Sequence, residues 1–368
     1  MSFTPLKFIY DKTFYNNFLS KLKEVVPTLN IEEFYSKIFN SEWKNRELKN
    51  RMKHTSFVLN KYLDRNFEKA SNQILQLIRI INLEDYKYGS LAFMFLPDYI
   101  ETYGIKYFDV SMATFEKLTE FTSCEFAVRP FIIQNQKKSF KILLQWSKNK
   151  NHHVRRLSSE CCRPKLPWAV ALKSLQKDPS PILPILENLK NDKEDYVYRS
   201  VANNLNDISK NHPKLVLKIA NTWNGKSKNT DWVVKHGLRT LLKKGNQDAM
   251  KIFGYGDENN YTISCFNIVH SNIKIGESLE FSFVLNNSTK AKNRLEYAIY
   301  FLRKNGKYSK KVFKISEKEY LANTISKIEK RHSFRIISSR KYYAGMHELS
   351  VIINGVERTK CKFYLECL

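Results

Sequence analysis

A short block of the chain places one acidic side chain among several basic ones and an aromatic ring. Glu160 lies four residues after Arg156 and eight before Trp168, in the segment HHVRRLSSECCRPKLPW at 152–168. The other cations of the block are Arg155, Arg163 and Lys165. Cations grouped in this way can hold phosphates, and the face of a tryptophan ring attracts positive charge. The simpler interpretation of Glu160 is an ion pair with Arg156 or Arg163 at helical spacing.

Basic residues recur along the chain at a spacing typical of stacked helix pairs. Arg156, Arg199 and Lys235 lie 43 and 36 positions apart, each in a similar local sequence. HEAT repeats are helix pairs of about this length, which stack because a single pair cannot bury its own apolar face. We expect residues 182–191 to form an outer helix and 196–210 an inner, concave one. An ordinary helical bundle with chance similarity is the alternative.

The hydrophobic pattern divides the chain into a helical and a β part. Up to about residue 255, apolar residues recur at three- and four-residue spacing, and prolines fall at the expected helix ends or first turns. Beyond that point alternation of period two predicts about seven short strands, with turn residues such as Asn354-Gly355 between them. The sequence therefore predicts a mostly α chain, with a HEAT-like repeat α-solenoid over 1–256 and a small immunoglobulin-like β-sandwich over 260–368.

The charge of the chain points to a polyanionic partner. It holds 62 Lys and Arg against 36 Asp and Glu, a formal net charge of +26, and cations of this kind bind phosphates by displacing counterions. The segment 290–341 alone holds 16 Lys and Arg against 4 Glu, so the β domain is a second candidate DNA-gripping surface. A lysine-rich composition from an A·T-rich genome is the alternative explanation.

The cysteines and the apolar runs exclude several classes of protein. The six cysteines include no C-x-x-C pair and no His partners at zinc-finger spacing, which predicts reduced thiols without a metal site or disulfides. The N-terminus lacks a signal-peptide pattern, and no run approaches the ~18 apolar residues of a membrane span. We expect a soluble cytoplasmic protein that does not contact a membrane.

Long runs of the sequence resemble one family. They are 122–131 (TSCEFAVRPF), the 152–168 block, 178–223 and 231–255 (DWVVKHGLRTLLKKGNQDAMKIFGY). These runs closely resemble the AlkC branch of the bacterial DNA alkylation repair glycosylases, which are relatives of AlkD. The resemblance is firm over roughly 100–255 and weaker before it. It implies HEAT-like repeats in a C-shaped cradle, and some members carry a C-terminal immunoglobulin-like domain, which matches the predicted strands.

The resemblance also implies an activity. Members of this branch remove N3-methylated bases, chiefly 3-methyladenine with 3-methylcytosine as a second candidate, and use no metal or organic cofactor. Such bases carry positive charge and leave as neutral molecules, so no strong general acid is needed. The partner implied is double-stranded DNA containing alkylated bases, bound by a monomer at the bacterial nucleoid.

Site residues follow from the same resemblance. The family's carboxylates fall on Glu125, Glu160 and Asp207, which would stabilise an oxocarbenium-like sugar and position a water. Trp168 would form a wall against the base or the deoxyribose. Alternatively, Asp207 is only a polar residue near a helix end, and Trp168 packs in a core. The expected DNA contacts are Arg155, Arg156, Arg163, Lys165, Arg199, Trp232, Lys235 and Arg239.

Three points stay open at the level of the sequence. Cys161 stands where the family pattern has glycine, which leaves the backbone after Glu160 undetermined. The lesion is reached either by flipping the nucleotide or by bending the duplex. A non-catalytic HEAT-repeat DNA-binding module, or a protein scaffold, is an alternative to the enzyme, and carboxylates that converge near Trp168 would favour the enzyme.

Overall fold

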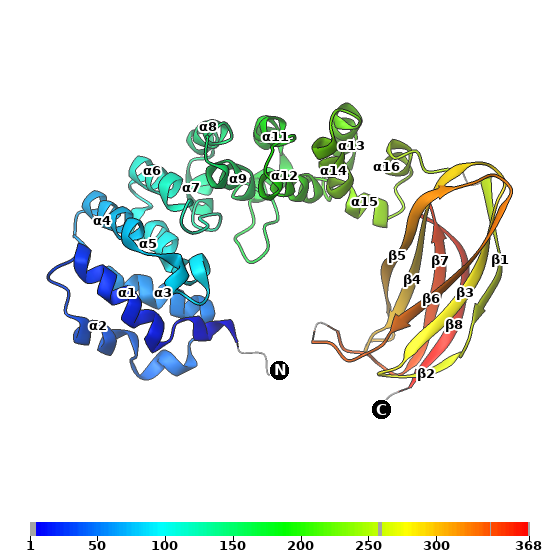
Figure 1. Cartoon of the computed structure of the whole chain (residues 1–368), viewed down its shortest axis with the longest axis horizontal. Coiled ribbons are helices and arrows are strands. Elements are labelled where there is room, and N and C mark those ends of the chain that lie inside the picture. Colours follow the sequence, from blue (N-terminus) through cyan, green and yellow to red (C-terminus); the bar gives the residue numbers. More distant parts are fainter. Residues whose placement is uncertain (1–4, 257–259, 339, 367–368) are drawn as a thin grey trace. The chain divides into compact units, whose positions relative to one another are not determined.

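The chain folds as a series of helices followed by an all-β domain (Figure 1). The computed structural model describes residues 5–256, 260–338 and 340–366. The predicted fold class, a helical-repeat region followed by an immunoglobulin-like β-sandwich, is confirmed. No helix within these ranges is long and apolar enough to cross a membrane.

Two compact units make up the chain. One contains Met1–Asn211 with Gly225–Gly237, and the other His212–Asn224 with Leu238–Leu368. Helix α16 ends at Ile252 and strand β1 begins at Tyr261, so secondary structure changes type where the sequence indicates. The division into domains at 256 and 260 stays a prediction, because the compact units are divided elsewhere.

The first unit is built from short helices that pack in succession along the chain (Figure 1). Helix α12 packs against α9 on one side and α14 on the other, and α11 covers α9 and α12. This is the predicted arrangement of inner and outer helices. The α-helices of this unit are α1 (Lys12–Val25), α2 (Ile31–Ile38), α3 (Leu48–Leu59), α4 (Phe67–Ile80), α5 (Phe95–Gly104), α6 (Phe108–Leu118), α7 (Arg129–Gln134), α8 (Gln136–Trp146), α9 (His152–Glu160), α10 (Lys173–Lys177), α11 (Leu183–Leu189), α12 (Asp195–Ile208) and α14 (Lys228–Gly237).

Local sequence explains where helices of this unit begin and how closely they pack. Asn151 caps α9 by accepting a hydrogen bond from the His153 amide at 2.8 Å. Pro184 lies in the first turn of α11, where its missing N–H costs nothing. Gly237 ends α14 directly against α12, where a Cβ atom would come within 3.0 Å of the Leu205 Cβ. The missing side chain of Gly237 lets the inner helices α12 and α14 lie side by side.

The second unit combines three helices with two β-sheets. Its helices are α13 (Pro213–Trp223), α15 (Arg239–Lys243) and α16 (Gln247–Ile252). Its strands are β1 (Tyr261–Ile268), β2 (Asn272–Lys274), β3 (Ser278–Asn287), β4 (Ala291–Leu302), β5 (Tyr308–Tyr320), β6 (Thr324–Ser333), β7 (Gly345–Ile353) and β8 (Val356–Glu366). One sheet has the order β1-β3-β6 and the other β2-β8-β7-β4-β5.

Alternating apolar residues of the two sheets form one core. Phe281 and Phe283 of the smaller sheet are buried together with Leu295 and Leu349 of the larger one, as expected for a sandwich. The turn between β7 and β8 is made by Asn354-Gly355, with φ angles of 48° and 81°. Those angles fit a type I′ hairpin turn, so the turn predicted at these two residues is confirmed.

Candidate active site

Glu160 lies between two arginines at the end of α9. The Arg163 Nη1 atom donates a 2.7 Å hydrogen bond to the Glu160 Oε1 atom, and the Arg156 Nη2 atom lies 3.7 Å from the same oxygen. Only 7% of the Glu160 side chain is exposed. Both ion pairs proposed as the simpler interpretation of Glu160 are therefore present, but they hold the carboxylate within a larger cluster.

Arg156 connects Glu160 to the second predicted carboxylate. Its Nη1 atom donates to Glu125 Oε2 at 3.1 Å and to Ser123 Oγ at 2.8 Å. The guanidinium carbon also lies 4.6 Å from the ring centroid of Tyr196 on α12, a cation–π contact. Burial opposes the charged form of Arg156, but the attraction of Glu125 and Glu160 outweighs it, and the pKa of Arg156 is raised.

Arg163 connects Glu160 to the third carboxylate. Its Nε atom donates to Asp207 Oδ2 at 3.0 Å, and Lys210 donates from Nζ to Asp207 Oδ1 at 2.9 Å. The Asp207 side chain is 2% exposed, so it meets these cations and not solvent. For Arg163, too, burial would lower the pKa, but the attraction of Glu160 and Asp207 raises it.

The structure thus brings Glu125, Glu160 and Asp207 into one network in which carboxylates alternate with guanidinium groups. Glu125 is 14% exposed, so Glu125 and Glu160 are the two carboxylates with some access to solvent. Asp207 pairs with Arg163 and Lys210, and it is connected to Glu160 through Arg163. Charged pairs in such dry surroundings attract each other more strongly than in water, and they hold their geometry.

Trp168 lies in the loop between α9 and α10. Its side chain is 79% exposed, which excludes the core-packing interpretation. Its φ angle is +64°, a left-handed conformation that is rare for a bulky residue. The backbone oxygen of Trp168 accepts a 2.6 Å hydrogen bond from the Lys49 Nζ atom.

The remaining predicted DNA contacts differ in their surroundings. Arg199 is exposed, pairs with Asp195 on its own helix and lies 5.4 Å from the ring centroid of Trp232. Trp232 also stacks on His236, with 3.6 Å between the ring centroids. Lys165 donates to the Asn211 side chain at 2.6 Å. Lys235 lies on α14, and Arg239 is the first residue of α15 in the second compact unit.

Arg155 faces away from its neighbour Arg156. It donates to both oxygens of Asp192, at 2.6 and 3.0 Å. It also donates to the carbonyl oxygens of Asn149 and Lys150. A bidentate pair of this kind is strong and directional. Its guanidinium therefore ties the start of α9 to the turn before α12. This structural role explains the presence of Arg155 without a contact to a DNA phosphate.

The cysteines after Glu160 are structural. Cys161 and Cys162 are fully buried, and burial raises the pKa of the Cys162 thiol to about 12, which disfavours the reactive thiolate. Cys161 has φ −66° and ψ −26°. These are ordinary helical angles, so the position does not need the glycine of the family pattern.

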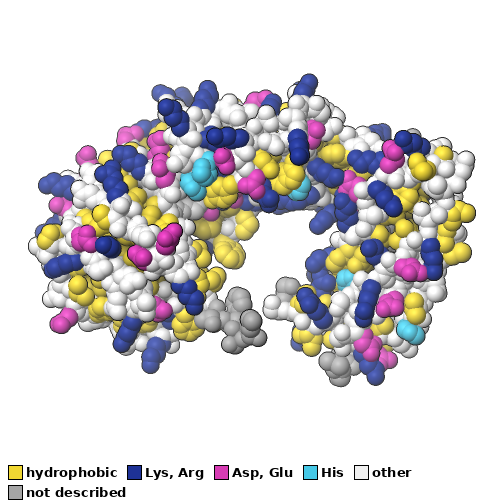
Figure 2. Space-filling model, in the orientation of Figure 1, with side chains coloured by type: hydrophobic (Ala, Val, Ile, Leu, Met, Phe, Trp, Pro, Cys, Tyr) yellow, Lys and Arg dark blue, Asp and Glu magenta, His cyan; other side chains and the backbone are white. Residues whose placement is uncertain are grey.

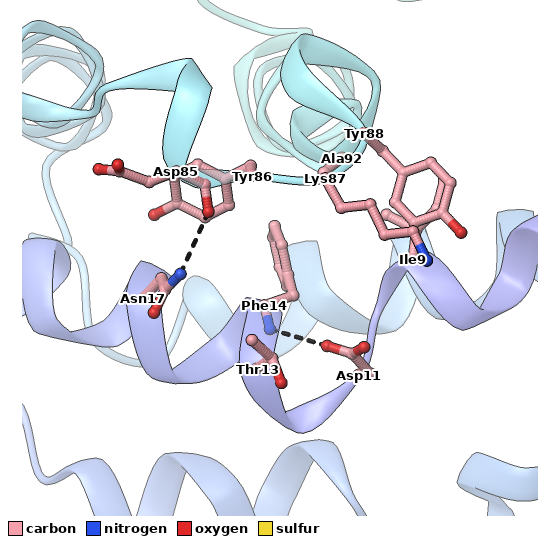
Figure 3. Close-up of a pocket in the computed structure, with 10 residues that line it drawn as sticks. All are labelled: Ile9, Asp11, Thr13, Phe14, Asn17, Asp85, Tyr86, Lys87, Tyr88 and Ala92. Carbon is pink, nitrogen blue, oxygen red and sulfur yellow. Dashed lines mark hydrogen bonds between the residues drawn. The ribbon is translucent and has the colours of Figure 1, made fainter.

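A pocket of about 250 Å³ lies elsewhere, among the first helices (Figure 3). In it, the Asn17 side chain donates to the Asp85 carbonyl oxygen at 3.3 Å, and Asp11 caps α1 by accepting from the Phe14 amide at 2.8 Å. Its lining comes from 9–17 and 85–92, and none of the predicted site residues belongs to these segments. Asp11 therefore serves the local fold as the cap of α1.

Charged side chains of both signs are spread over the surface of the molecule (Figure 2). On the face drawn in Figure 2, Lys and Arg side chains lie over the helices and over the strands, with Asp and Glu among them. Across the described ranges, no group of three or more His, Cys, Asp or Glu side chains could hold a metal ion.

Sequence reasoning missed several residues of the site. Ser123 and Tyr196 complete the surroundings of Arg156, and Lys49 reaches Trp168 across 119 residues of sequence. Tyr196 had a detectable signal, because the aligned repeats place His153 and Trp232 at similar positions before their cations. Lys49 had none, since nothing in the local sequence of α3 distinguishes it from the other lysines.

Stacked helix pairs carrying a carboxylate–guanidinium network, followed by an immunoglobulin-like sandwich, define a repeat protein with an appended β domain. A family model described as "DNA alkylation repair enzyme" matches residues 95–241, and one described as "Uncharacterised protein YhaZ, C-terminal Ig-like domain" matches 262–367. The chain belongs to the AlkC-type family of DNA alkylation repair enzymes, the family that its sequence resembles.

Two full-length relatives support that assignment. The uncharacterised protein YhaZ of Bacillus subtilis strain 168 is 39% identical over 97% of this chain and 98% of its own length. The solved structure of the alkylpurine DNA glycosylase AlkC from Pseudomonas fluorescens, bound to DNA containing an abasic site analogue, is 31% identical. It covers 99% of this chain and 100% of its own, with a TM-score of 0.93.

Proposed function

We propose that the chain is a DNA glycosylase that hydrolyses the N-glycosidic bond of cationic N3-alkylated bases in double-stranded DNA. The first substrate is 3-methyladenine and the second 3-methylcytosine. The enzyme acts as a monomer in base excision repair, at the nucleoid of the bacterial cytoplasm. The observation that carries the proposal is the placement of Glu125 and Glu160 around Arg156, where their side chains are 14% and 7% exposed.

The chemistry requires little from the protein. The glycosidic bond breaks with its electron pair moving to the base, which neutralises the positive charge of the alkylated ring. The deoxyribose carbon becomes cationic, and water attacks it and loses a proton. Glu125 and Glu160 stabilise the sugar cation and orient the water, because carboxylates in a partly dry site interact strongly with developing positive charge. Trp168 contacts the base or the sugar.

The remaining residues position these groups or bind phosphates. Asp207 holds Arg163, and Arg163 in turn holds the carboxylate of Glu160. Cations of the helical part bind the DNA backbone. They are Lys165, Arg199, Lys235 and Arg239, with Trp232 beside Arg199. The basic strands of the β domain supply a second DNA surface.

The test is release of bases from methylated duplex DNA by the purified protein, followed by chromatography. Glu160→Gln keeps the size and the hydrogen-bonding oxygen but removes the charge, so base release should fall by at least about tenfold with DNA binding intact or tighter. Glu187→Gln, an exposed carboxylate paired with Lys190 on the outer helix α11, is the matched control. Unchanged release by Glu160→Gln would remove Glu160 from the mechanism.

A second function has one observation in its favour. Glu125, Glu160 and Asp207 are all ion-paired, as they would be in a non-catalytic HEAT-repeat DNA-binding module that retains the family's surface. Such a module would bind the methylated duplex with the same salt dependence but free no base. The same chromatographic assay therefore separates the two functions.

A further inference from the structure

The loop that carries Trp168 is fixed at two places. At its base, the fully buried Arg129 donates from Nε to the Val170 carbonyl oxygen at 2.7 Å, and from Nη1 to the Cys161 carbonyl oxygen, also at 2.7 Å. At its tip, Lys49 of α3 donates to the carbonyl oxygen of Trp168 at 2.6 Å. The base is thus held from within the core, and the tip by one solvent-exposed cation.

Trp168 itself contributes little to its own placement. With 79% of the side chain exposed, the indole ring has few packing contacts to fix it. Its φ angle of +64° is unfavourable for a residue with a Cβ atom, and such conformations persist when the surroundings hold them. Within the part of the chain that the structure describes, the hydrogen bond from Lys49 acts directly on the Trp168 backbone.

Lys49 is itself held on this side of α3. Its Nζ atom lies 5.5 Å from the ring centroid of Phe126, the neighbour of Glu125. Burial raises the pKa of Glu101 on α5, and Lys49 lies close enough to oppose that shift in part. The aromatic face of Phe126 therefore helps to keep the ammonium group near the loop.

We propose that Lys49 is a positioning residue that places Trp168 for the reaction, a claim that rests on the proposed glycosylase function. A cation that holds an exposed aromatic ring in an unfavourable backbone conformation limits the orientations of that ring before DNA arrives. Preorganisation of this kind acts on the chemical step more than on binding. Lys49 precedes the region matched by the DNA alkylation repair model, 95–241, so the first helices contribute to the site.

The first measurement follows Trp168 without any reaction. Its fluorescence is obtained as the difference between each protein and the same protein carrying Trp168→Phe, which removes the signal of the other tryptophans. In Lys49→Met, the anisotropy of this difference signal should fall and acrylamide should quench it more strongly. Lys49→Arg should restore both, because arginine keeps a donor cation. Lys53→Met, one turn along α3 and also near Glu101, should match the unmodified protein.

The second measurement is single-turnover excision from methylated duplex DNA at saturating protein. Lys49→Met should slow base release by about tenfold, with less than a twofold change in affinity for an abasic-analogue duplex. Lys49→Arg should recover most of the rate, and Lys53→Met should leave it unchanged. A merely structural role would lower the stability of Lys49→Met without this separation of rate from affinity.

The outcomes separate the two proposals. Unchanged Trp168 fluorescence in Lys49→Met overturns the positioning role, as does a changed fluorescence with an unchanged excision rate. Weaker DNA binding with unchanged fluorescence and an unchanged saturated rate would make Lys49 a phosphate contact and also overturn it. If the unmodified protein frees no base, the proposed function fails and the catalytic part of this inference fails with it. The fluorescence then still decides whether Lys49 places Trp168.

Discussion

The Arg163 guanidinium and the Asp207 carboxylate form a buried ion pair that joins the turn after α9 to α12, with 3.0 Å between Nε and Oδ2. Because Arg163 also donates to Glu160 at 2.7 Å, the position of the Glu160 carboxylate depends on a residue one repeat away. Stacking of consecutive helix pairs is what makes this dependence possible. The repeat architecture therefore serves the site directly, since Glu125, Glu160 and Asp207 come from separate segments of the chain that the stacking brings together.

Removal of Arg163 should destabilise the helical unit strongly. In Arg163→Met, Glu160 and Asp207 lose the cation that lies between them, and a broken buried ion pair costs about 3–5 kcal/mol. The measurement is urea-induced unfolding followed by circular dichroism. Arg199→Met is the matched control, because its pair with Asp195 is exposed at 59% and 61% of the two side chains, and such pairs contribute about 0–1 kcal/mol. Equal losses in the two variants would contradict a buried, structurally important network.

Adjacent residues explain why the sequence predicts part of this site and not the rest. Arg155 and Arg156 look alike in the sequence, and both were expected to contact DNA. On a helix, consecutive side chains point about 100° apart, so Arg156 meets Glu125 while Arg155 meets Asp192. Only the packing of neighbouring helices decides which arginine faces the network.

The helices, the sandwich and the grouping of the acids are predicted more successfully than the contacts of single arginines. The reasons differ from one feature to the next. Periodicity and proline placement determine the elements locally, as in α12 and at the Asn354-Gly355 turn. The grouping of Glu125, Glu160 and Asp207 came from the family resemblance and not from spacing. Lys49 could not be predicted, because its contact with Trp168 depends on the tertiary arrangement of α3 and the loop after α9.

Replacement of Arg199, but not of Arg155, should change the salt dependence of DNA binding. Arg199 is exposed beside Trp232, so Arg199→Gln should weaken binding to undamaged duplex and lower the slope of log K against log salt by about 1. Arg155→Gln should leave that slope unchanged and lower the unfolding temperature, because it breaks the bidentate pair with Asp192. Fluorescence anisotropy with a labelled duplex at several salt concentrations gives both slopes. An identical slope in Arg199→Gln and the unmodified protein would exclude Arg199 from the phosphate contacts.

Glu101 should make the helical unit less stable as the pH rises. Burial, and then repulsion from Asp98, raises the pKa of Glu101 from 4.5 to about 7, although Lys53 and Lys49 oppose the shift. The folded chain thus retains a proton that the unfolded chain releases, so stability falls between about pH 4.5 and 7. Glu101→Gln should raise the unfolding temperature at pH 8 more than at pH 5. The exposed Glu120→Gln serves as the control, and a pH-independent effect of Glu101→Gln would contradict the shift.

His332 should make the β domain less stable as the pH falls, which is the opposite of the effect of Glu101 on the helical unit. Its ring is buried against Phe313, with 4.7 Å between the ring centroids, and its Nδ1 atom is 2.9 Å from the Tyr297 hydroxyl. Burial, followed by repulsion from nearby cations, lowers the pKa of His332 from 6.5 to about 4. Below pH 6.5 the unfolded chain binds a proton that the folded domain does not bind. The stability that the neutral ring contributes is therefore fully present above that pH and is lost as the pH falls toward 4. The loss reaches at most about 3 kcal/mol.

His332→Asn keeps a polar atom near Tyr297 but does not titrate, so the difference in unfolding temperature between pH 7.5 and 4.5 should shrink. The exposed His270→Asn should leave that difference unchanged, and a full acid-induced loss in His332→Asn would assign the effect to other groups.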